Sequence, residues 1–326
     1  MQNSVLCLRP EADFLRAGVM PPAALAITYA TPADPALATR IAGADALLIP
    51  AIGPKLAPTL FEAGRIKLVQ VTGAGVDRLD ADAMRTLAIP VANVPGGSNG
   101  AVADYCVGAA LTLLRRLGWS SAEIKRGHYA AFRARMLADN LAGLEGLAVG
   151  VVGLGVIGQA VAAAFAAQGS HIVYFDPAPR DAAAADRAGW RALTLAELLA
   201  AADVVTLHVP LLPATTGLVG APELARMKPG AILINAARGG IVDEAALAAS
   251  LAAGQIAGAA VDVYTSEPPA PDDPLLRVSG EAGERLLLTP HIAGVTRQSS
   301  ARLFSAAWDN VERVLVRGEP PLNVCI

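Results

Sequence analysis

The four histidines of the chain are the first candidates for proton chemistry. They are His128, His171, His208 and His291. His291 stands in the segment LLTPHIAGVT, where an apolar run ends at Pro290 and small residues follow. A histidine just past a strand can be an ordinary loop or core residue, or it can exchange a proton near neutral pH. The choice depends on which other polar residues also follow strands.

Several polar residues follow predicted strands in the second half of the chain. They are Asp176, His208, Arg238, Asp262, Glu267 and His291. Parallel strands end at one edge of a sheet, so we expect these residues to lie close together. A histidine beside a carboxylate can trade a proton with a carbonyl oxygen, and an arginine can bind a carboxylate through two hydrogen bonds. Taken singly, Arg238 could be a structural ion-pair partner and Glu267 a solvated loop residue.

The segment GLGVIG, residues 153–158, is the clearest cofactor signal. It follows an apolar strand and opens a helix, as the glycine-rich turn of dinucleotide-binding folds does. Gly153 permits the tight turn, Gly155 leaves room for a pyrophosphate, and Gly158 lets helix and strand pack closely. The amides at the start of the helix would then face the phosphates.

Asp176 ends the next predicted strand, where a ribose-binding carboxylate is expected. A carboxylate accepts hydrogen bonds from ribose hydroxyls and repels a 2′-phosphate, so the sequence favours NAD over NADP. A structural glycine turn followed by a surface aspartate is the simpler alternative. The strand before the turn and the helix after it count against that alternative.

Short aliphatic runs alternate with helical segments, which indicates an α/β fold with two doubly wound parallel sheets. The first series of predicted strands covers residues 4–8, 26–29, 46–49, 68–71 and 90–93. The second series covers residues 147–152, 171–175, 204–208, 231–235, 256–261 and 286–289. Helices are predicted at residues 35–41, 59–63, 101–116 and 296–316.

Composition and charge argue against nucleic acid and membrane partners. The chain has 326 residues, of which 54% are hydrophobic and 17% charged, as expected for a globular protein of two domains. The net charge of −3 gives no attraction to a polyanion. No apolar stretch of about 20 residues lacks interruption, so no membrane span is predicted.

Cysteine usage and the start of the chain predict a cytoplasmic protein without a metal. Cys7, Cys106 and Cys325 are far apart and show no metal-ligand spacing, so we expect reduced thiols. Met1 is followed by no basic segment with an apolar core, so no signal peptide is expected.

The chain resembles the D-isomer-specific 2-hydroxyacid dehydrogenases, which include phosphoglycerate, glyoxylate/hydroxypyruvate and D-lactate dehydrogenases. The resemblance covers nearly the whole chain and rests on three segments. They are GLGVIG, MKPGAILINAARGGIVDEAALAASLAAGQIAGAAVDVYTSEPP (residues 227–269) and TPHIAG (residues 289–294). The second segment is long and very specific. By this resemblance, Arg238, Glu267 and His291 form the catalytic trio, and Asp262 lies near the nicotinamide.

The resemblance also implies a domain organisation. A Rossmann NAD-binding domain, residues 99–296, would be inserted into a flavodoxin-like substrate-binding domain made of residues 1–98 and 297–326. The cleft between the domains would close on the substrate and exclude water. The segment around residues 101–145 resembles the dimerisation region, which implies a homodimer.

Two sets of ligand-binding residues follow from the resemblance and the strand ends. The cofactor set is Gly153, Gly155, Val156, Ile157, Gly158, Asp176, His208, Val209, Pro210, Thr215, Ala236, Ala237, Asp262 and Gly294. The substrate set is Gly73, Ala74, Gly75, Ser98, Arg238 and His291. Ser98 stands where the family often has asparagine, Asp104 replaces a glutamate, and Leu212 a threonine. The changes at residues 98 and 104 bear on the substrate more than on the reaction.

We therefore expect NAD-dependent interconversion of a D-2-hydroxy acid and its 2-keto acid, with the protein acting as a 2-keto acid reductase. His291 would be the acid/base, Glu267 would stabilise its imidazolium, and Arg238 would bind the substrate carboxylate and polarise the carbonyl. A formate dehydrogenase is one alternative, although related formate enzymes carry glutamine in place of Glu267. An NAD(H)-sensing corepressor or binding protein is another, because such relatives can keep the same trio. The sequence does not identify the side chain of the hydroxy acid.

Overall fold

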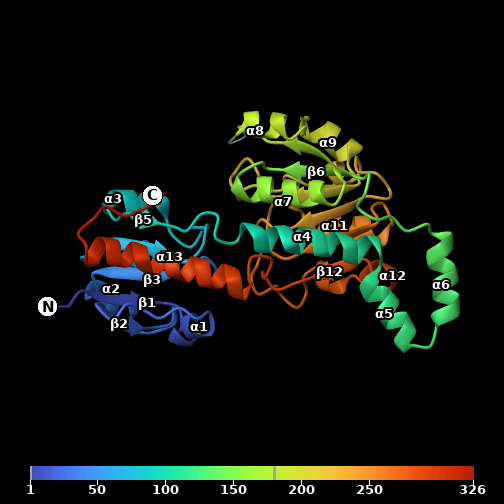
Figure 1. The fold of residues 1–326 in the computed structure, drawn as a ribbon. Coiled ribbons are helices and arrows are strands. Elements are labelled where there is room, and N and C mark those ends of the chain that lie inside the picture. The colour runs from blue at the N-terminus through green and yellow to red at the C-terminus, as the bar shows by residue number, and fades with distance from the viewer. Residues whose placement is uncertain (1, 179–180) are drawn as a thin grey trace. The chain divides into compact units, whose positions relative to one another are not determined.

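The computed structural model describes residues 2–178 and 181–326 of the chain. Helices and strands alternate along it, and the chain folds into two compact units (Figure 1). Unit 1 comprises residues 1–98 and 295–326, and unit 2 comprises residues 99–294. The predicted boundary after residue 296 lies two residues beyond the end of unit 2.

Unit 1 is built on a parallel sheet of five strands. The strands are β1 (Ser4–Cys7), β2 (Ala26–Tyr29), β3 (Ala46–Ile49), β4 (Leu68–Val71) and β5 (Val91–Ala92). Their order, β2-β1-β3-β4-β5, is that of flavodoxin-like folds and confirms the predicted fold class. In the register of the sheet, Leu6 pairs with Leu47, and Leu47 pairs with Val69. The central strand β3 is buried along its whole length, as expected for a parallel sheet covered on both faces.

Unit 2 is built on a parallel sheet of seven strands. The strands are β6 (Ala148–Val152), β7 (His171–Phe175), β8 (Arg191–Ala192), β9 (Val204–Leu207), β10 (Ile232–Asn235), β11 (Gly258–Val261) and β12 (Leu286–Leu288). Their order is β12-β11-β10-β9-β6-β7-β8. Counted from β6, this is the Rossmann order 3-2-1-4-5-6 with one further strand at the edge. The predicted Rossmann fold is confirmed.

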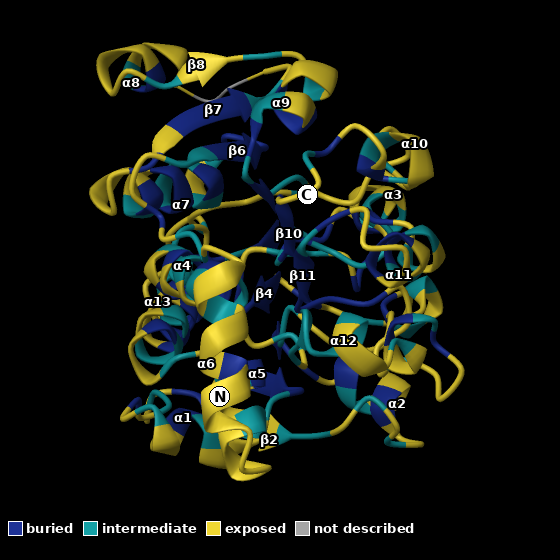
Figure 2. Cartoon of the chain, turned by 90° about the vertical axis from the view of Figure 1, so that its right-hand side faces the viewer, coloured by how far each residue is buried: buried dark blue, intermediate teal, exposed yellow. Residues whose placement is uncertain are grey.

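Helices cover both faces of each sheet, and Figure 2 shows the strands largely buried beneath partly exposed helices. In unit 1 the helices are α1 (Glu11–Arg16), α2 (Leu37–Ala42), α3 (Ala81–Thr86) and α13 (Arg297–Leu315). In unit 2 they are α4 (Asn99–Leu114), α5 (Leu117–Lys125), α6 (Tyr129–Ala138), α7 (Val156–Ala167), α8 (Ala182–Arg187), α9 (Leu195–Ala201), α10 (Ala221–Leu224), α11 (Glu244–Ala252) and α12 (Gly280–Gly283). Alternate residues of β10 face opposite cores: Ile232 and Ile234 lie in the cluster of Phe165, and Leu233 in that of Leu198.

The C-terminal helix α13 completes the core of unit 1. Its buried residues follow a helical spacing and include Phe304, Trp308 and Val311. The rings of Phe304 and Trp308 pack on Phe14 of α1, with centroids 4.9 and 5.3 Å away. The helix begins at Thr296, whose hydroxyl accepts a hydrogen bond from the Ser299 amide. One face of the unit 1 sheet is therefore covered by residues from both ends of the chain.

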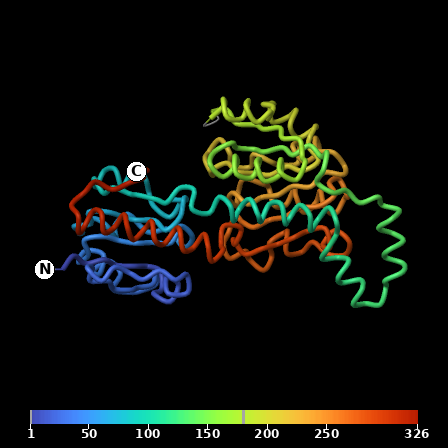
Figure 3. Tube along the Cα trace, viewed as in Figure 1, coloured from blue at the N-terminus to red at the C-terminus, as the bar shows by residue number. Residues whose placement is uncertain are grey.

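After α4 the trace of unit 2 extends away from its sheet through α5 and α6 and then returns to β6 (Figure 3). Trp119 and Phe132 pack on each other between these two helices, with ring centroids 5.3 Å apart. Leu117, Tyr129 and Leu137 remain more than half exposed on the same segment.

The structure corrects some details of the predicted elements. The helix predicted at residues 59–63 is wrong, since only a single 3-10 turn, Pro58–Leu60, forms there. Helix α4 begins at Asn99, two residues before the predicted start. Strand β8 was not predicted because it has only two residues, both exposed, and so carries no apolar run. Among the described residues, no helix is long and apolar enough to cross a membrane.

Gly158 sets the distance between α7 and the turn that precedes it. A Cβ atom at this position would overlap the carbonyl oxygen of Gly153, which is backbone and cannot turn aside. Gly108, in α4, is an exposed helical glycine with no atom within 4 Å of a Cβ. Gly158 and Gly108 therefore form a matched pair of helical glycines, of which only Gly158 lies against backbone of another segment.

Gly158→Ala should lower the free energy of unfolding by about 1–3 kcal/mol or more, because the added methyl group forces backbone to move. Gly108→Ala should raise it by about 0.4–1 kcal/mol, because alanine restricts the unfolded chain and fits a helix. Urea unfolding without added cofactor measures both. Similar effects of the two substitutions would contradict the close approach of α7 to the turn.

Candidate active site

The glycine turn between β6 and α7 has the shape that an anion requires. Gly153 adopts φ +93°, and a Cβ there would lie 2.7 Å from the carbonyl oxygen of His208. Gly155 caps α7, no side chain hydrogen-bonds to this helix end, and no atom lies within 4 Å of a Cβ at this residue. The first amides of α7, including those of Val156 and Ile157, are thus available to a phosphate.

Asp176 follows β7 directly and is fixed against the glycine turn. Its Oδ2 accepts a hydrogen bond from the Leu154 amide at 2.7 Å. Its Oδ1 accepts one from the Ala178 amide at 2.9 Å. The carboxylate therefore lies beside the turn, as a ribose-binding carboxylate should. Together, the turn, the helix end and this carboxylate fit a dinucleotide.

His208 lies at the end of β9 and is uncharged at neutral pH. Its Nε2 lies 2.8 Å from the hydroxyl of Thr206. Its Nδ1 is buried, and within the described part of the chain it has no hydrogen-bond partner. Burial lowers the pKa of His208 to about 3. This histidine is therefore unsuited to proton transfer near pH 7, and it lies uncharged next to Gly153.

The other cofactor candidates after β9 and β10 lie in two ordered loops. They are Val209, Pro210, Thr215, Ala236 and Ala237. The Thr215 hydroxyl donates to the Pro210 carbonyl at 2.6 Å and accepts from the Leu212 amide at 2.8 Å. Thr215 thus closes the loop after β9 on itself.

His291 and Glu267 form a hydrogen-bonded pair at the ends of β12 and β11. The His291 Nδ1 lies 2.9 Å from Oε2 and 3.1 Å from Oε1 of Glu267. The Tyr264 amide donates to Glu267 Oε1 at 3.1 Å, which fixes the carboxylate. The two side chains are only 23% and 29% exposed, so the pair is partly shielded from solvent. A carboxylate only accepts, so Nδ1 carries the proton and Nε2 is left to act on a ligand.

The loop that carries His291 is held by Asp262, which is fully buried. His291 adopts φ +53°, a left-handed conformation that is uncommon outside glycine, and its amide donates to the Asp262 carbonyl at 2.7 Å. Asp262 Oδ1 accepts from the Thr289 hydroxyl at 2.6 Å and from the Ile292 amide at 2.8 Å. Oδ2 accepts from the Ala293 amide at 2.8 Å. The carboxylate that the sequence assigned to the cofactor therefore also positions the histidine.

Arg238 lies in the turn after β10, and buried Asn235 shapes that turn. The Asn235 amide group donates to the Arg238 carbonyl at 3.1 Å and accepts from the Ala237 amide at 3.2 Å. A Cβ at Gly239 would overlap the carbonyl oxygen of Tyr264, so the turn lies directly against the loop after β11. Arg238 is thereby held beside the loop that carries Glu267.

The predicted substrate residues other than Arg238 and His291 belong to unit 1. Gly73, Ala74 and Gly75 follow β4, and Ser98 ends the first segment of the unit. The Gly73 carbonyl accepts from the Val94 amide at 2.9 Å, and the Ala74 carbonyl accepts from the Asn93 side chain at 2.7 Å. The loop after β4 is therefore ordered by the segment that follows β5. Gly294, the last cofactor candidate, ends unit 2.

Three residues that shape the site were missed by sequence reasoning: Asn235, Tyr264 and Thr289. Each of them binds the loops that carry the candidate trio. Thr289 could have been predicted from the sequence. It is a polar residue that follows an apolar strand and stands directly before the Pro-His pair of TPHIAG. The contacts of Asn235 and Tyr264 involve backbone groups, which leave no mark in the sequence.

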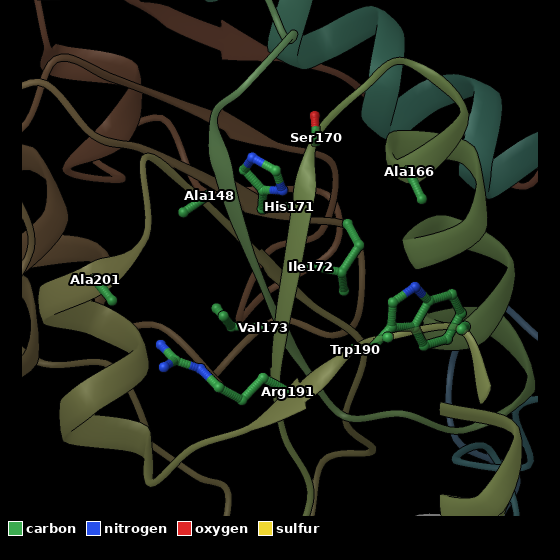
Figure 4. Close-up of a pocket in the computed structure, with 11 residues that line it drawn as sticks. Ala148, Ala166, Ser170, His171, Ile172, Val173, Trp190, Arg191 and Ala201 are labelled. Carbon is green, nitrogen blue, oxygen red and sulfur yellow. The ribbon is translucent and has the colours of Figure 1, made fainter. Parts of the chain in front are cut away.

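A cavity of about 440 Å³ lies elsewhere in unit 2. Its lining includes Ala148, His171 and Arg191, the first residues of β6, β7 and β8. Figure 4 shows His171, Ile172 and Val173 along β7, with Trp190 and Arg191 nearby. The cavity therefore opens at the amino ends of strands whose carboxyl ends carry the glycine turn and Asp176. Ligands of doubly wound sheets bind at the carboxyl ends, so this cavity is not the candidate active site.

Among the residues that the structure describes, no cluster of three or more histidine, cysteine, aspartate or glutamate side chains could hold a metal ion.

Comparisons with known proteins agree with the geometry of unit 2. Residues 107–293 match the family model of the D-isomer specific 2-hydroxyacid dehydrogenase, NAD binding domain. This match identifies unit 2 as an NAD-binding domain.

Two relatives of known name align with most of the chain. D-3-phosphoglycerate dehydrogenase of Archaeoglobus fulgidus is 37% identical over 267 residues, which cover 82% of this chain and 48% of the relative. (S)-sulfolactate dehydrogenase of Chromohalobacter salexigens is 39% identical over 262 residues, which cover 79% of this chain and 78% of the relative. The chain spans about half of the length of the phosphoglycerate dehydrogenases that it matches.

A solved structure shares the fold over almost the full length. D-lactate dehydrogenase from Aquifex aeolicus, complexed with NAD and lactic acid, superposes with a TM-score of 0.84 and 26% identity. The alignment covers 97% of this chain and 96% of that one. Since the family model matches more than half of its residues, the chain belongs to the D-isomer-specific 2-hydroxyacid dehydrogenase family.

Proposed function

We propose that the protein is an NAD-dependent dehydrogenase that interconverts a D-2-hydroxy acid and its 2-keto acid. The observation that carries the proposal is the His291–Glu267 pair, with 2.9 Å between Nδ1 and Oε2. The pair follows β12 and β11 of the sheet whose β6 leads into the glycine turn. The proposed acid/base pair and the glycine turn thus belong to one compact unit.

In this proposal His291 moves the proton. With Nδ1 bound to Glu267, the protonated ring donates from Nε2 to the carbonyl oxygen of a keto acid during reduction. The neutral ring accepts a proton from the hydroxyl during oxidation. Glu267 stabilises the imidazolium through its charge and keeps the ring oriented through the hydrogen bond.

Arg238 binds and polarises the substrate. Its guanidinium can hold a carboxylate through two parallel hydrogen bonds. The turn that carries it is fixed by Asn235 and lies against the loop of Glu267. The amides of the loop of Gly73–Gly75, in unit 1, would share the same carboxylate. Unit 1 is then the substrate-binding domain and unit 2 the cofactor domain.

NAD supplies the hydride acceptor and, in its reduced form, the hydride donor. The amino end of α7 would hold its pyrophosphate, and Asp176 its adenosine ribose. A 2′-phosphate would meet the negative charge of Asp176, so NADH is preferred over NADPH.

The proposed substrate is a 2-hydroxy acid of D configuration, a class whose members differ in their side chain. The Aquifex aeolicus relative was solved with lactic acid, and the Chromohalobacter salexigens relative is named for sulfolactate. These two acids differ in size and charge.

We further propose a cytoplasmic homodimer. The exposed apolar residues Leu117, Tyr129 and Leu137 on the extended α5–α6 segment would be covered by a second copy. Cys7 and Cys106 are buried free thiols, as suits a reducing compartment.

A panel of 2-keto acids, followed by NADH absorbance and chiral analysis of the product, tests the reaction. Formate with NAD tests the formate dehydrogenase alternative in the same assay. Steady turnover with one or more keto acids and a D product supports the proposal. Tight NADH binding without turnover across the panel would instead favour a corepressor or binding protein.

Asp176→Ala should erode the preference for NADH over NADPH, because the charge that repels a 2′-phosphate is removed. The measurement is kcat/KM with each cofactor for the unmodified protein and the variant. If the unmodified protein uses both cofactors equally well, Asp176 does not select the cofactor.

Arg238→Lys should impair both turnover and apparent substrate affinity, while NADH binding is largely retained. Lysine keeps the charge but replaces the planar fork by a single point contact. Kinetics with the best keto acid and a fluorescence titration of NADH measure the two effects. Activity within about twofold of the unmodified protein would show that Arg238 is structural or peripheral.

His291→Ala should cut turnover by roughly 10²–10⁴-fold, the usual effect of removing a positioned proton-transfer group. NADH should still bind, since the glycine turn and Asp176 are unchanged. His128→Ala is the matched control, because His128 Nδ1 lies 2.6 Å from Glu123 in an exposed pair of the same unit. Equal loss in both variants would show that His291 has no special role.

Glu267→Gln should move the pH profile rather than abolish it. Glutamine can bind the ring but does not stabilise imidazolium, so the protonated form is less favoured. Reduction needs the protonated ring, so its alkaline limb should move to lower pH. Oxidation needs the neutral ring, so its acidic limb should also move to lower pH. Stopped-flow rates in both directions measure this, and two unmoved limbs would mean that His291 works without Glu267.

A further inference from the structure

The buried carboxylate of Asp262 has a fixed hydrogen-bond pattern. It accepts from the Thr289 hydroxyl and from the amides of Ile292 and Ala293. The Asp262 side chain is fully buried, so its oxygens depend on these three neutral donors in place of water.

Three titratable side chains that feel the charge of Asp262 are themselves neutral. Cys106 of α4 and Tyr264 after β11 feel its charge, and burial raises the pKa of each to about 12. Tyr105 of α4 also feels it, and burial raises the pKa of this tyrosine as well. All three keep their protons at neutral pH, so Tyr105 is a hydrogen-bond donor.

The direction of each hydrogen bond between α4 and Asp262 follows from these facts. The Tyr105 hydroxyl lies 2.8 Å from the Thr289 hydroxyl, and both residues belong to unit 2. Thr289 has a single hydroxyl proton, and this proton goes to Asp262 Oδ1 at 2.6 Å. Tyr105 must therefore donate to Thr289. The relay runs from Tyr105 through Thr289 to Asp262.

We propose that Tyr105 is a positioning residue for the reaction: its hydroxyl orients that of Thr289 toward Asp262 and so helps to hold the loop of His291. The catalytic meaning of this relay rests on the function proposed above. Donation by Tyr105 polarises the Thr289 hydroxyl and strengthens its bond to the carboxylate. When the Asp262 carboxylate is held more firmly, it also fixes the amides of Ile292 and Ala293, which follow His291 directly in the sequence.

The hydrogen bonds of the relay help to hold an unfavourable backbone conformation in the loop of His291. His291 is held at φ +53°, a left-handed conformation that is unfavourable for a residue with a side chain. The loop therefore keeps this conformation only while its hydrogen bonds persist. Helix α4, far from the loop in sequence, supplies one of them through Tyr105.

Hydrogen exchange of the protein without substrate or cofactor tests the relay directly. In Tyr105→Phe, the amides of Ile292 and Ala293 should exchange about 2- to 12-fold faster, the factor that matches the net worth of one hydrogen bond. Tyr174→Phe removes a hydroxyl from a buried tyrosine of β7 in the same unit and is the matched control. Unchanged exchange in Tyr105→Phe would overturn the proposal.

Substitutions at Thr289 separate the relay from general loosening. With Thr289→Val the relay has no middle link, so adding Tyr105→Phe should change the exchange no further. With Thr289→Ser the hydroxyl remains, so Tyr105→Phe should keep its full effect. Additive effects of Tyr105→Phe and Thr289→Val would overturn the relay. If Thr289→Val does not fold, the serine pair and the Tyr105→Phe exchange still decide the question.

Activity adds an independent readout. Tyr105→Phe should lower kcat for the keto acid several-fold and leave the KM for NADH unchanged, because the glycine turn and Asp176 are intact. Faster exchange in a protein that turns over no keto acid would support the relay and refute the proposed dehydrogenase. Normal kcat together with unchanged exchange would refute the relay alone.

Discussion

The common direction of the strands is the constraint on which the site depends. All seven strands of unit 2 are parallel, so the carboxyl ends of β6, β7, β9, β10, β11 and β12 meet at one edge. Each strand can then carry apolar residues along its length and one polar residue just past its end. The glycine turn, Asp176, Arg238, Glu267 and His291 all occupy such positions. A parallel sheet in this way gathers the reactive groups at one edge, next to the buried carboxylate of Asp262.

Below this edge, small residues and buried polar groups set the geometry. Glycine is required at residues 153, 158 and 239, where a Cβ would meet backbone of a neighbouring segment. The carboxylate of Asp262 joins β11 to the loop after β12, and Asn235 shapes the turn after β10. These groups position the loops that carry Arg238, Glu267 and His291.

Much of the architecture was predictable because burial leaves a clear pattern. The predicted bounds of β2, β3, β4 and β7 match the structure to the residue. Burial explains this for β3 and β4, which are buried along their whole length, whereas β2 is partly exposed at the edge of its sheet. The two-residue strand β8 is exposed and leaves no such pattern. The helix predicted at residues 59–63 is wrong, because a single 3-10 turn, Pro58–Leu60, already places Phe61 in the core of unit 1. The proposed trio could be selected from its positions at strand ends, whereas the Tyr105–Thr289 hydrogen bond could not, because its partners lie 184 residues apart.

The position of α13 has a consequence for how the chain is made. Phe14 lies in a core that needs Phe304 and Trp308, and these residues are synthesised after the whole of unit 2. Unit 2 is a continuous segment and can fold as it leaves the ribosome. The sheet of unit 1, although synthesised first, keeps one apolar face uncovered until the last helix emerges. The unit begun first is therefore finished last, and during that interval its open face is the part of the nascent chain most exposed to aggregation and most in need of a chaperone.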